Sequence, residues 1–480
     1  MKLLVLILLF PLIVSAQNDV EQMSIHQNEY ELHRHDSVAQ GAQSVAVPLV
    51  LPKSSGKMIL AKKVYGWHPY WVSSSAYLSY DYNALSHIAY FGYETDSATG
   101  GYTTIRDWNT TPVIAYAHQR GVKVTLTVVS FGYDANDKLL SDTIRQQRMI
   151  NTLISLLKSR NGDGVNFDIE SLRNTQRANL VAFMRRATTQ IKSQVPGAEI
   201  SMATPAVDWS GTWDFSQLAQ ICDYLIVMGY DYYWTGSTTA GPVAPLEGEN
   251  YNITRTVDTY ISNGVPREKL LLGVPWYGLD WPVQSAARKS GATGTASSRT
   301  YVVAEQMAGS YGKSFDQATK VPWFSYTSGL PWRQVWYDDS QSLGLKYDLV
   351  NSRSLGGIGI WALSYDGGKA EIWSGIRSAF ATTSVETATS PNPNRYQLLQ
   401  NYPNPFNPTT NIEFQVANRG FVNLKVFDAL GREVATIVNE QKEPGSYVVR
   451  WDASAVPSGV YFCVMSAPGV VQTRSMVVLR

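Results

Sequence analysis

Apolar and polar positions change their spacing several times along this chain. Between residue 64 and about residue 380, short apolar runs alternate with longer segments that are amphipathic or loop-like. Segments 142–160 and 179–195 carry apolar side chains at the i, i+3, i+4, i+7 positions that make one face of a helix apolar. The short apolar runs predict eight buried strands, at residues 64–67, 87–91, 122–130, 164–169, 199–203, 224–228, 270–275 and 357–362.

Eight strands that alternate with helices are typical of an α/β fold, the (β/α)8 TIM barrel. A doubly wound parallel sheet is the competing architecture. About 80 residues separate the seventh strand from the eighth, which is too many for one helix, and they are rich in Gly, Ser, Thr, Tyr and Trp. We therefore expect a small β-rich insertion between strands 7 and 8, within a barrel domain that spans residues 62–381.

The pattern changes again after residue 381. Residues 382–395 are rich in Thr, Ser and Pro and are typical of a linker. Six short strand patterns follow, separated by turn residues, at 411–416, 421–428, 432–438, 446–452, 459–466 and 471–478. This spacing predicts a small all-β sandwich domain over residues 396–480.

The N-terminal segment has the pattern of an export signal. A lysine and an apolar run lead to the small residues Ser15 and Ala16, which predicts a signal peptide over residues 1–16. The run is shorter than the ~20 apolar residues that span a bilayer, so we expect no stable membrane insertion of the mature chain. Residues 17–61 are polar and aperiodic and predict a flexible leader.

Composition narrows the class of partner. The formal net charge is +1, with 40 Lys and Arg residues against 39 Asp and Glu, which disfavours a nucleic-acid partner. Aromatic residues make up 12% of the chain, and all of the Trp except Trp451 lie between Trp67 and Trp373, so flat, uncharged ligands should bind to the barrel. Cys222 and Cys463 lie in different predicted domains, which argues against a disulfide or a cysteine-based metal site.

The predicted fourth strand carries polar residues on one face. Side chains alternate along a strand, so Asn166, Asp168 and Glu170 point to one side while the apolar residues between them face the helices. In a barrel the polar side is the lumen, and Glu170 lies at the C-terminal rim, where catalytic groups of such barrels sit. A single Asp-x-Glu pair also occurs in buried hydrogen-bond networks, but three further motifs accompany this one.

Four motifs in the correct order resemble those of glycoside hydrolase family 18. Residues 163–170 (DGVNFDIE) are similar to the family's acidic signature, Asp-Gly-x-Asp-x-Asp-x-Glu, with Asn166 in place of the middle Asp. Residues 129–132 (VSFG) resemble its Ser-x-Gly-Gly segment, although a Tyr follows where the second Gly would be. Residues 228–232 (MGYDY) resemble its Met-x-Tyr-Asp motif, and residues 356–361 (GGIGIW) resemble the strand that ends in its active-site Trp. The set is typical of a chitinase-like glycosidase.

The resemblance implies a substrate-assisted mechanism with no cofactor and no metal, in which the 2-acetamido oxygen of the sugar attacks the anomeric carbon. It implies that Glu170 is the general acid and then the base, that Asp168 orients the acetamide N–H, and that Tyr230 donates to the acetamide carbonyl. The expected substrate-binding residues are Asn166, Met228, Asp231, Trp361 and Trp276. Further tryptophans that follow strand ends are candidates for stacking on sugars, with core packing as the equal alternative: Trp67, Trp71, Trp209, Trp234 and Trp281.

Asn166 is the departure from the family pattern. An amide cannot share a proton as an Asp does, so an inner proton relay along the strand is lost. We expect Asp168 to stay anionic and to accept a hydrogen bond from the Asn166 amide, which preserves its partnership with Glu170.

The tail has a resemblance of its own. Residues 401–410 (NYPNPFNPTT) and 457–461 (PSGVY) are similar to the C-terminal sorting domains of proteins exported by the type IX secretion system. The implied partner is the type IX secretion machinery, and the implied location is secreted or on the cell surface. A structural or carbohydrate-binding β-module is the alternative.

We therefore expect a secreted glycosidase that cleaves β-1,4 bonds beside N-acetylglucosamine in chitin-type polysaccharides. A peptidoglycan N-acetylglucosaminidase is an alternative, because residues 334–339 (QVWYDD) also resemble cell-wall members of the family. A chitin-binding lectin on an inactive barrel is an alternative of another class, which the presence of Glu170 disfavours.

Overall fold

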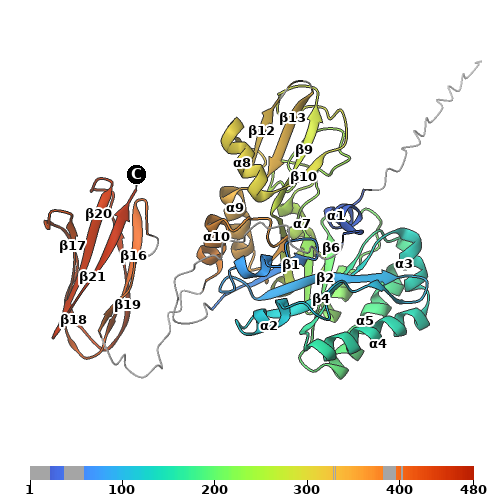
Figure 1. Cartoon of the computed structure of the whole chain (residues 1–480), viewed down its shortest axis with the longest axis horizontal. Helices are drawn as coiled ribbons and strands as arrows, with labels where there is room; N and C mark the ends of the chain where they lie inside the picture. The colour runs from blue at the N-terminus through green and yellow to red at the C-terminus, as the bar shows by residue number, and fades with distance from the viewer. Residues whose placement is uncertain are drawn as a thin grey trace, which may run out of the picture. The chain divides into compact units, whose positions relative to one another are not determined.

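A computed structural model describes residues 22–36, 59–327, 329, 331–381, 396–401 and 404–479. The chain forms two compact units, one within Met1–Thr382 and one within Thr383–Arg480 (Figure 1). The predicted signal peptide and linker lie outside the described residues. No helix in the described ranges is long and apolar enough to cross a membrane.

The first unit is the predicted barrel of eight parallel strands. The first strand pairs with both the second and the last, which closes the ring, and a short antiparallel strand, β3 (Gly101–Thr104), extends the second. Each predicted apolar run corresponds to one barrel strand. These strands are β1 (Lys63–Pro69), β2 (His87–Asp96), β4 (Lys123–Ser130), β5 (Gly164–Ile169), β6 (Glu199–Pro205), β7 (Tyr224–Met228), β8 (Leu270–Pro275) and β14 (Gly357–Trp361).

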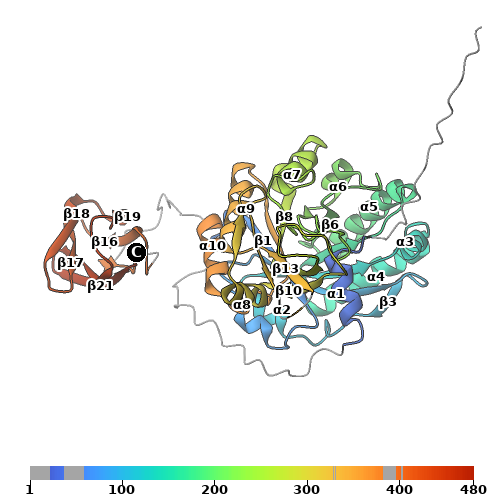
Figure 2. The ribbon, with the colours of Figure 1, turned by 90° about the horizontal axis from the view of Figure 1, so that it is seen from above.

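Helices surround the barrel (Figure 2). The best predicted of them, α4, begins where the Asp142 side chain accepts hydrogen bonds from two free backbone N–H groups, and ends where Asn161 adopts the left-handed conformation. The helices of this layer are α2 (Val113–His118), α3 (Tyr133–Leu140), α4 (Thr143–Arg160), α5 (Arg177–Gln194), α6 (Phe215–Ile221), α7 (Ile253–Ser262), α9 (Ser340–Ser352) and α10 (Ala370–Phe380). Short 3-10 helices lie at Ala76–Ser79, Asn174–Gln176 and Arg267–Lys269.

The predicted β-rich insertion is present between β8 and β14. It is a five-stranded antiparallel sheet in the order β10-β9-β13-β12-β11, with helix α8 (Tyr301–Tyr311) beside it. Its own small core includes Phe324, Val335 and Tyr337. The strands are β9 (Tyr277–Val283), β10 (Ser297–Thr300), β11 (Ser314–Asp316), β12 (Val321–Tyr326) and β13 (Trp332–Tyr337).

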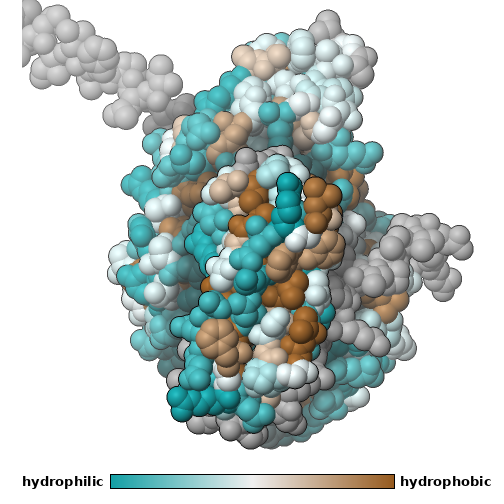
Figure 3. Space-filling model, turned by 90° about the vertical axis from the view of Figure 1, so that its left-hand side faces the viewer, coloured by the Kyte–Doolittle hydropathy of each residue, from teal (hydrophilic) through white to brown (hydrophobic). Residues whose placement is uncertain are grey.

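The second unit is the predicted all-β domain. A three-stranded sheet in the order β15-β16-β19 and a four-stranded sheet in the order β18-β17-β20-β21 share one apolar core. The outer faces also carry exposed apolar side chains such as Phe421 and Val448. Apolar and polar side chains lie next to one another over one face of the molecule in Figure 3. The strands are β15 (Gln397–Leu398), β16 (Thr409–Val416), β17 (Gly420–Asp428), β18 (Glu433–Lys442), β19 (Gly445–Asp452), β20 (Gly459–Ala467) and β21 (Val470–Val478).

Residues 22–36 differ from the flexible leader that we expected. They form a folded segment with helix α1 (Ile25–His33), whose first backbone N–H groups are capped by the Ser24 side chain. The helix buries Ile25, His26 and Glu29 against the barrel. The remainder of the predicted leader up to residue 58 lies outside the described residues. The expectation failed because two of the three buried side chains are polar, so the segment has no apolar stripe to indicate burial.

Candidate active site

The predicted acidic face of β5 points into the barrel. Asn166 and Asp168 are fully buried, and the Glu170 side chain at the strand end is 12% exposed. The Glu170 backbone is fixed on both sides, since its N–H donates to the Ser130 carbonyl at 3.0 Å and its carbonyl accepts from the Asn136 amide. One strand therefore places two carboxyl groups next to one another at the C-terminal rim.

Burial shifts the pKa of both carboxyl groups upward. Burial is the main cause that raises the pKa of Asp168 to about 7. Burial, followed by the nearby Asp168 charge, raises the pKa of Glu170 well above its usual value. Asp168 Oδ1 is buried and has no hydrogen-bond partner among the described residues. The raised pKa of Glu170 favours its protonated carboxyl, which is the form that a general acid needs.

The Asn166 amide does not donate a hydrogen bond to Asp168, contrary to our expectation. Its Oδ1 accepts a hydrogen bond from Trp67 Nε1 at 2.9 Å, and its Nδ2 donates to Ser201 Oγ at 2.9 Å. Ser201 lies on the neighbouring strand β6, whereas Trp67 lies on β1, which does not pair with β5, so the amide links side chains of three barrel strands. Burial raises the pKa of Asp168 to about 7, and the expectation that this carboxyl group stays anionic remains a prediction.

The end of β7 supplies the next group of predicted residues. Met228, Tyr230 and Asp231 all line the same cavity as Glu170. Asp231 has a φ of 59°, a conformation that is rare for residues other than glycine and common at functional sites. Its Oδ1 accepts a hydrogen bond of 2.6 Å from the Tyr277 hydroxyl of the insertion, and burial raises its pKa to about 6.

Trp361, at the end of β14, forms the apolar floor of the site. Its indole is fully buried and lies against Phe91, with ring centroids 5.1 Å apart, and against Trp67, with centroids 6.0 Å apart. The predicted floor of the site is therefore a flat aromatic face beside the two carboxyl groups.

Helix α1 places its own side chains against the predicted catalytic and substrate-binding residues. The His26 ring stacks on Trp361 with centroids 3.7 Å apart and planes at 27°. His26 Nδ1 lies 2.8 Å from Asp168 Oδ2, and Nε2 lies 2.8 Å from the Tyr230 hydroxyl. Burial lowers the pKa of His26 to about 4, so the ring is neutral. These contacts are not predictable from the sequence, since a polar segment far from the motifs gives no sign of which cavity it enters.

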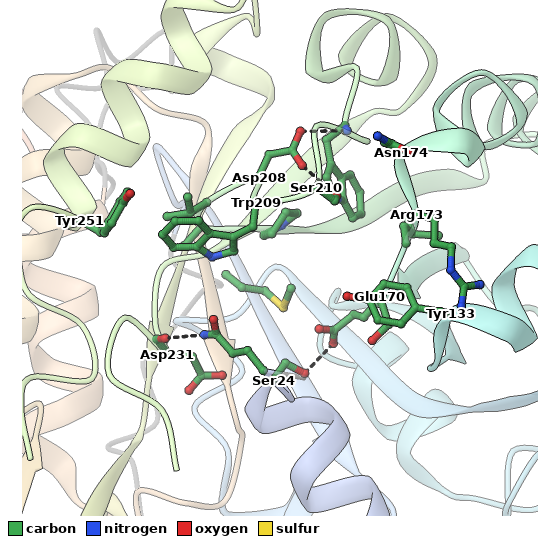
Figure 4. A pocket seen from close by; sticks show the side chains of 18 of the residues that line it. Ser24, Tyr133, Glu170, Arg173, Asn174, Asp208, Trp209, Ser210, Asp231 and Tyr251 are labelled. Carbon is green, nitrogen blue, oxygen red and sulfur yellow. Dashed lines mark hydrogen bonds between the residues drawn. The ribbon is translucent and has the colours of Figure 1, made fainter. Parts of the chain in front are cut away.

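An open cavity of about 850 Å³ lies on the outer side of Glu170 (Figure 4). Trp209 and Tyr251 form its exposed aromatic part, with ring centroids 4.6 Å apart, and the Trp209 side chain is 65% exposed. Tyr133 and Arg173 lie on the opposite wall. An exposed, flat aromatic surface next to a carboxylic acid suits a sugar face.

Trp276 does not reach this site. Its ring is fully buried and packs edge-on against Trp373 of α10, with centroids 5.0 Å apart. We expected Trp276 to bind substrate because it follows a strand end, but the first residue after β8 turns outward into the helix layer. Trp67 and Trp281 are also fully buried, so of the further tryptophan candidates Trp209 is the one that lines the open cavity.

One group of side chains in the described part of the chain has ligand atoms close enough for a metal ion. His26, Asp168 and Glu170 each offer one atom within 4.8 Å of the others. His26 Nδ1 and Asp168 Oδ2 are 2.8 Å apart, closer than the roughly 3.3 Å between two ligands of a tetrahedral zinc ion. The spacing is that of a hydrogen bond rather than of a metal site.

Known proteins share this arrangement of fold and motifs. The sequence model of glycosyl hydrolases family 18 matches residues 64–366, and that of a secretion system C-terminal sorting domain matches residues 400–479. Di-N-acetylchitobiase of Mus musculus is 27% identical over 321 residues, which cover 60% of this chain and 79% of the mouse protein. The cortical fragment-lytic enzyme of Bacillus subtilis (strain 168) is 27% identical over 235 residues, 47% of this chain and 52% of that protein.

Solved structures share the barrel. A chitinase from Cycas revoluta, determined as a mutant in complex with (GlcNAc)4, has a TM-score of 0.60 at 20% identity and covers 66% of this chain and 99% of that chain. The C-terminal domain of a putative chitinase from Desulfitobacterium hafniense has a TM-score of 0.59 at 23% identity, with the same coverage. Because the family match over residues 64–366 spans more than half of the sequence, this chain belongs to glycosyl hydrolase family 18 and is a glycosidase.

Proposed function

We propose that the barrel hydrolyses β-1,4 bonds beside N-acetylglucosamine in chitin or chitooligosaccharides, with retention of configuration at the anomeric carbon. One observation carries the proposal: Asp168 Oδ2 and the Tyr230 hydroxyl each lie 2.8 Å from one of the two ring nitrogens of His26, so together they hold one small group with a donor and an acceptor, and Glu170 beside them reaches the open cavity. Such a pair suits an acetamido group that serves as the nucleophile, whereas a two-carboxylate glycosidase uses its second carboxylate on the sugar or on a water.

The proposed mechanism assigns one task to each group. Glu170 protonates the leaving glycosidic oxygen while the acetamido oxygen attacks the anomeric carbon, and Glu170 then takes a proton from the water that opens the oxazolinium ring. Asp168 accepts the acetamide N–H and stabilises the positive charge of that ring. Tyr230 donates to the acetamide carbonyl.

The remaining side chains hold the sugar. Trp361 provides the apolar floor, and Met228 and Asp231 line the wall beside it. Asn166 fixes the lining through Trp67 and Ser201 rather than by touching the sugar. The names of the relatives support this substrate class, since they include di-N-acetylchitobiases and a chitinase solved with (GlcNAc)4.

A peptidoglycan N-acetylglucosaminidase is the second candidate. Similarity to the cortical fragment-lytic enzyme of Bacillus subtilis favours it. The wide cavity beside Trp209 also has room for a branched neighbour of the cleaved sugar. A lectin without activity is the candidate of another class, and the retained Glu170 and Asp168 weigh against it.

The test separates these candidates by their products. The protein is incubated with chitooligosaccharides, with purified peptidoglycan and with cello-oligosaccharides, and the products are identified by mass and by the anomer that NMR detects first. We expect cleavage of N-acetylated substrates with the retained anomer first, and no cleavage of cello-oligosaccharides. Early appearance of the inverted anomer, or efficient cleavage of cello-oligosaccharides, contradicts the proposed mechanism.

The C-terminal unit supports a location. We propose that the chain is exported through a signal peptide over residues 1–16, and that residues 396–480 address it to the type IX secretion machinery for release or attachment at the cell surface. The match to a secretion system sorting domain supports this role.

A further inference from the structure

We propose that residues 22–36 are an internal inhibitor of this enzyme, in which the His26 side chain occupies the place of the substrate's acetamido group. The identity of the mimicked group rests on the proposed function. We name residues 22–36 the plug. Inhibition by the plug goes beyond the proposed function, because it adds a state in which the chain itself fills the sugar site.

The His26 ring offers the same hydrogen-bonding groups as an acetamide. With the Asp168 carboxylate as acceptor at 2.8 Å, Nδ1 carries the ring proton, so Nε2 accepts from the Tyr230 hydroxyl at 2.8 Å. An N-acetyl group presents an N–H donor and a carbonyl acceptor to the same two residues in the proposed mechanism. The ring also lies flat on Trp361, at 3.7 Å between centroids, where the sugar would stack.

The residues before the helix block the catalytic acid. The Ser24 hydroxyl donates to Glu170 Oε1 at 2.8 Å, the side where the glycosidic oxygen must approach (Figure 4). The Ile25 backbone N–H donates to Asp231 Oδ2 at 2.6 Å, and Gln22 Nε2 donates to the Asp231 carbonyl at 3.1 Å. Every polar group that the mechanism uses is therefore already paired with the plug.

The remaining turns of α1 anchor the plug at the rim. Glu29 is buried and accepts hydrogen bonds from Trp361 Nε1 at 3.1 Å and from the Tyr365 hydroxyl at 2.5 Å. His33 stacks on Trp71, with centroids 4.9 Å apart and planes at 10°. Because contacts extend along the whole of α1, the helix and the barrel rim form a complementary interface rather than a single fortuitous contact.

Occupation by the plug has a direct kinetic consequence. His26 has no exposed surface, so a sugar reaches Trp361 only after the plug has left. The apparent affinity for substrate is then reduced by the fraction of molecules in which the site is open. Residues 37–58 join the plug to β1 in the sequence, so displacement by substrate or a cut in this stretch separates the plug from the barrel.

The first experiment compares His26→Ala with a matched control in the chain from Gln17 to the C-terminus. The control is Leu32→Ala, on the same helix, because this side chain is 70% exposed. Loss of two hydrogen bonds and a stacked ring should lower the KM for (GlcNAc)4 by roughly tenfold or more, with little change in kcat. The control should match the unsubstituted chain. An unchanged or higher KM in His26→Ala overturns the proposal.

A binding measurement keeps this inference separate from the proposed activity. Each chain also carries Glu170→Gln, and (GlcNAc)4 is titrated by calorimetry, which needs no turnover. Tighter binding in His26→Ala, together with no hydrolysis by the matching chains that retain Glu170, means that the plug is real and the proposed activity is wrong. Equal binding by both chains means that the plug does not cover the site.

A second route does not depend on how His26→Ala folds. A recognition site for a specific protease replaces part of residues 37–58, and the folded chain is cut and passed through a gel filtration column. We expect (GlcNAc)4 to bind roughly tenfold or more tightly after the cut, and a synthetic peptide of residues 22–36 to reverse the gain. A cut that leaves the affinity unchanged, or a peptide that does not compete, refutes the plug.

Discussion

The two folded units of this chain bury different kinds of side chain. In the barrel unit ionisable groups are buried at several places, and one cluster of them, Asp168, His26 and Glu29, lies at the candidate site. In the described part of the C-terminal unit, the buried polar side chains are Asn401 and Thr410, which are hydrogen-bonded to each other at 2.9 Å. Buried ionisable groups cost free energy unless they are paired, so a cluster of them marks the place where a protein performs chemistry. The comparison indicates that the candidate catalytic groups belong to the barrel and not to the tail.

The largest effect should come from removing the proton donor. Glu170→Gln, introduced into the His26→Ala chain so that the site is open, should lower kcat for (GlcNAc)4 by roughly 10²–10⁴-fold, because the amide keeps the shape but cannot donate the proton. Binding measured by calorimetry should change little. The matched control is Glu440→Gln, which alters an exposed carboxyl group of the tail and should leave kcat as it was. Turnover within a few-fold of the parent would assign the acid to another residue.

The plug should respond to pH in two opposite ways. Burial raises the pKa of Glu29 from 4.5 to about 7, so docking favours the protonated carboxyl, and its contribution is complete below pH 4.5 and lost as the pH rises through 7. Burial lowers the pKa of His26 from 6.5 to about 4, so docking favours the neutral ring, and its contribution is complete above pH 6.5 and lost as the pH falls toward 4. The groups that face these two side chains are Asp168, Glu170, Tyr230, Asp231, Tyr365, Trp361 and Ser298.

Neither contribution is complete between about pH 4.5 and 6.5, but both are largely present there, so we expect the plug to hold best in this window, with a shallow decline on either side. The affinity of the peptide of residues 22–36 for the cut chain, measured by fluorescence anisotropy across pH 4–9, should fall on both sides of this window. Glu29→Gln in the peptide should remove the decline on the alkaline side and leave the acid side in place. An affinity that is constant across this pH range would contradict the expected titration of Glu29 and His26 on docking.

The barrel strands were predictable because each of them has a local pattern of apolar residues in the sequence. The bounds of β5, β7 and β8 coincide with three of the predicted runs. β7 and β8 are nearly continuous apolar segments, as strands buried on both faces are. The alternation along β5 also gave the direction of Asp168 and Glu170 correctly. Local patterns of two to eight residues were enough for these features.

The contacts between distant segments were not predictable in this way. Trp276 follows a strand end as Trp361 ends one, and only the packing against Trp373 decides that the first faces the helix layer. Asn166 bonds to Trp67 of β1 and Ser201 of β6, partners on other strands that the alternation along β5 does not reveal. Helix α1 contacts side chains far away in the sequence, and two of its three buried residues are polar, so its own sequence has no apolar pattern that predicts burial.

A smaller effect is expected at the open side of the cavity. Trp209→Ala removes an exposed aromatic surface, and such contacts contribute about 0.5–1.5 kcal/mol, so KM for oligosaccharides should rise about two- to tenfold while kcat stays within twofold. Steady-state kinetics in the His26→Ala chain measure both constants. Tyr311→Ala is the matched control, since this exposed ring belongs to the insertion and does not line the cavity. Equal KM values for the two variants would mean that sugars do not stack on Trp209.

The smallest effect on catalysis should follow removal of the whole C-terminal unit. The contacts of the chain divide at Thr382, and the carboxyl groups, the aromatic floor and the open cavity all belong to the first unit. A chain that ends at Thr382 should therefore fold, with kcat/KM on (GlcNAc)4 and binding to insoluble chitin within twofold of the full chain, as measured by product release and by sedimentation with the polymer. In the native host the same truncation should keep the enzyme in the periplasm and remove it from the cell surface and medium, because the matched sorting domain is absent. A truncated enzyme that still reaches the medium but no longer binds insoluble chitin would make the tail a carbohydrate-binding module. The contrast between a catalytic barrel and a tail that serves only for sorting would then be wrong.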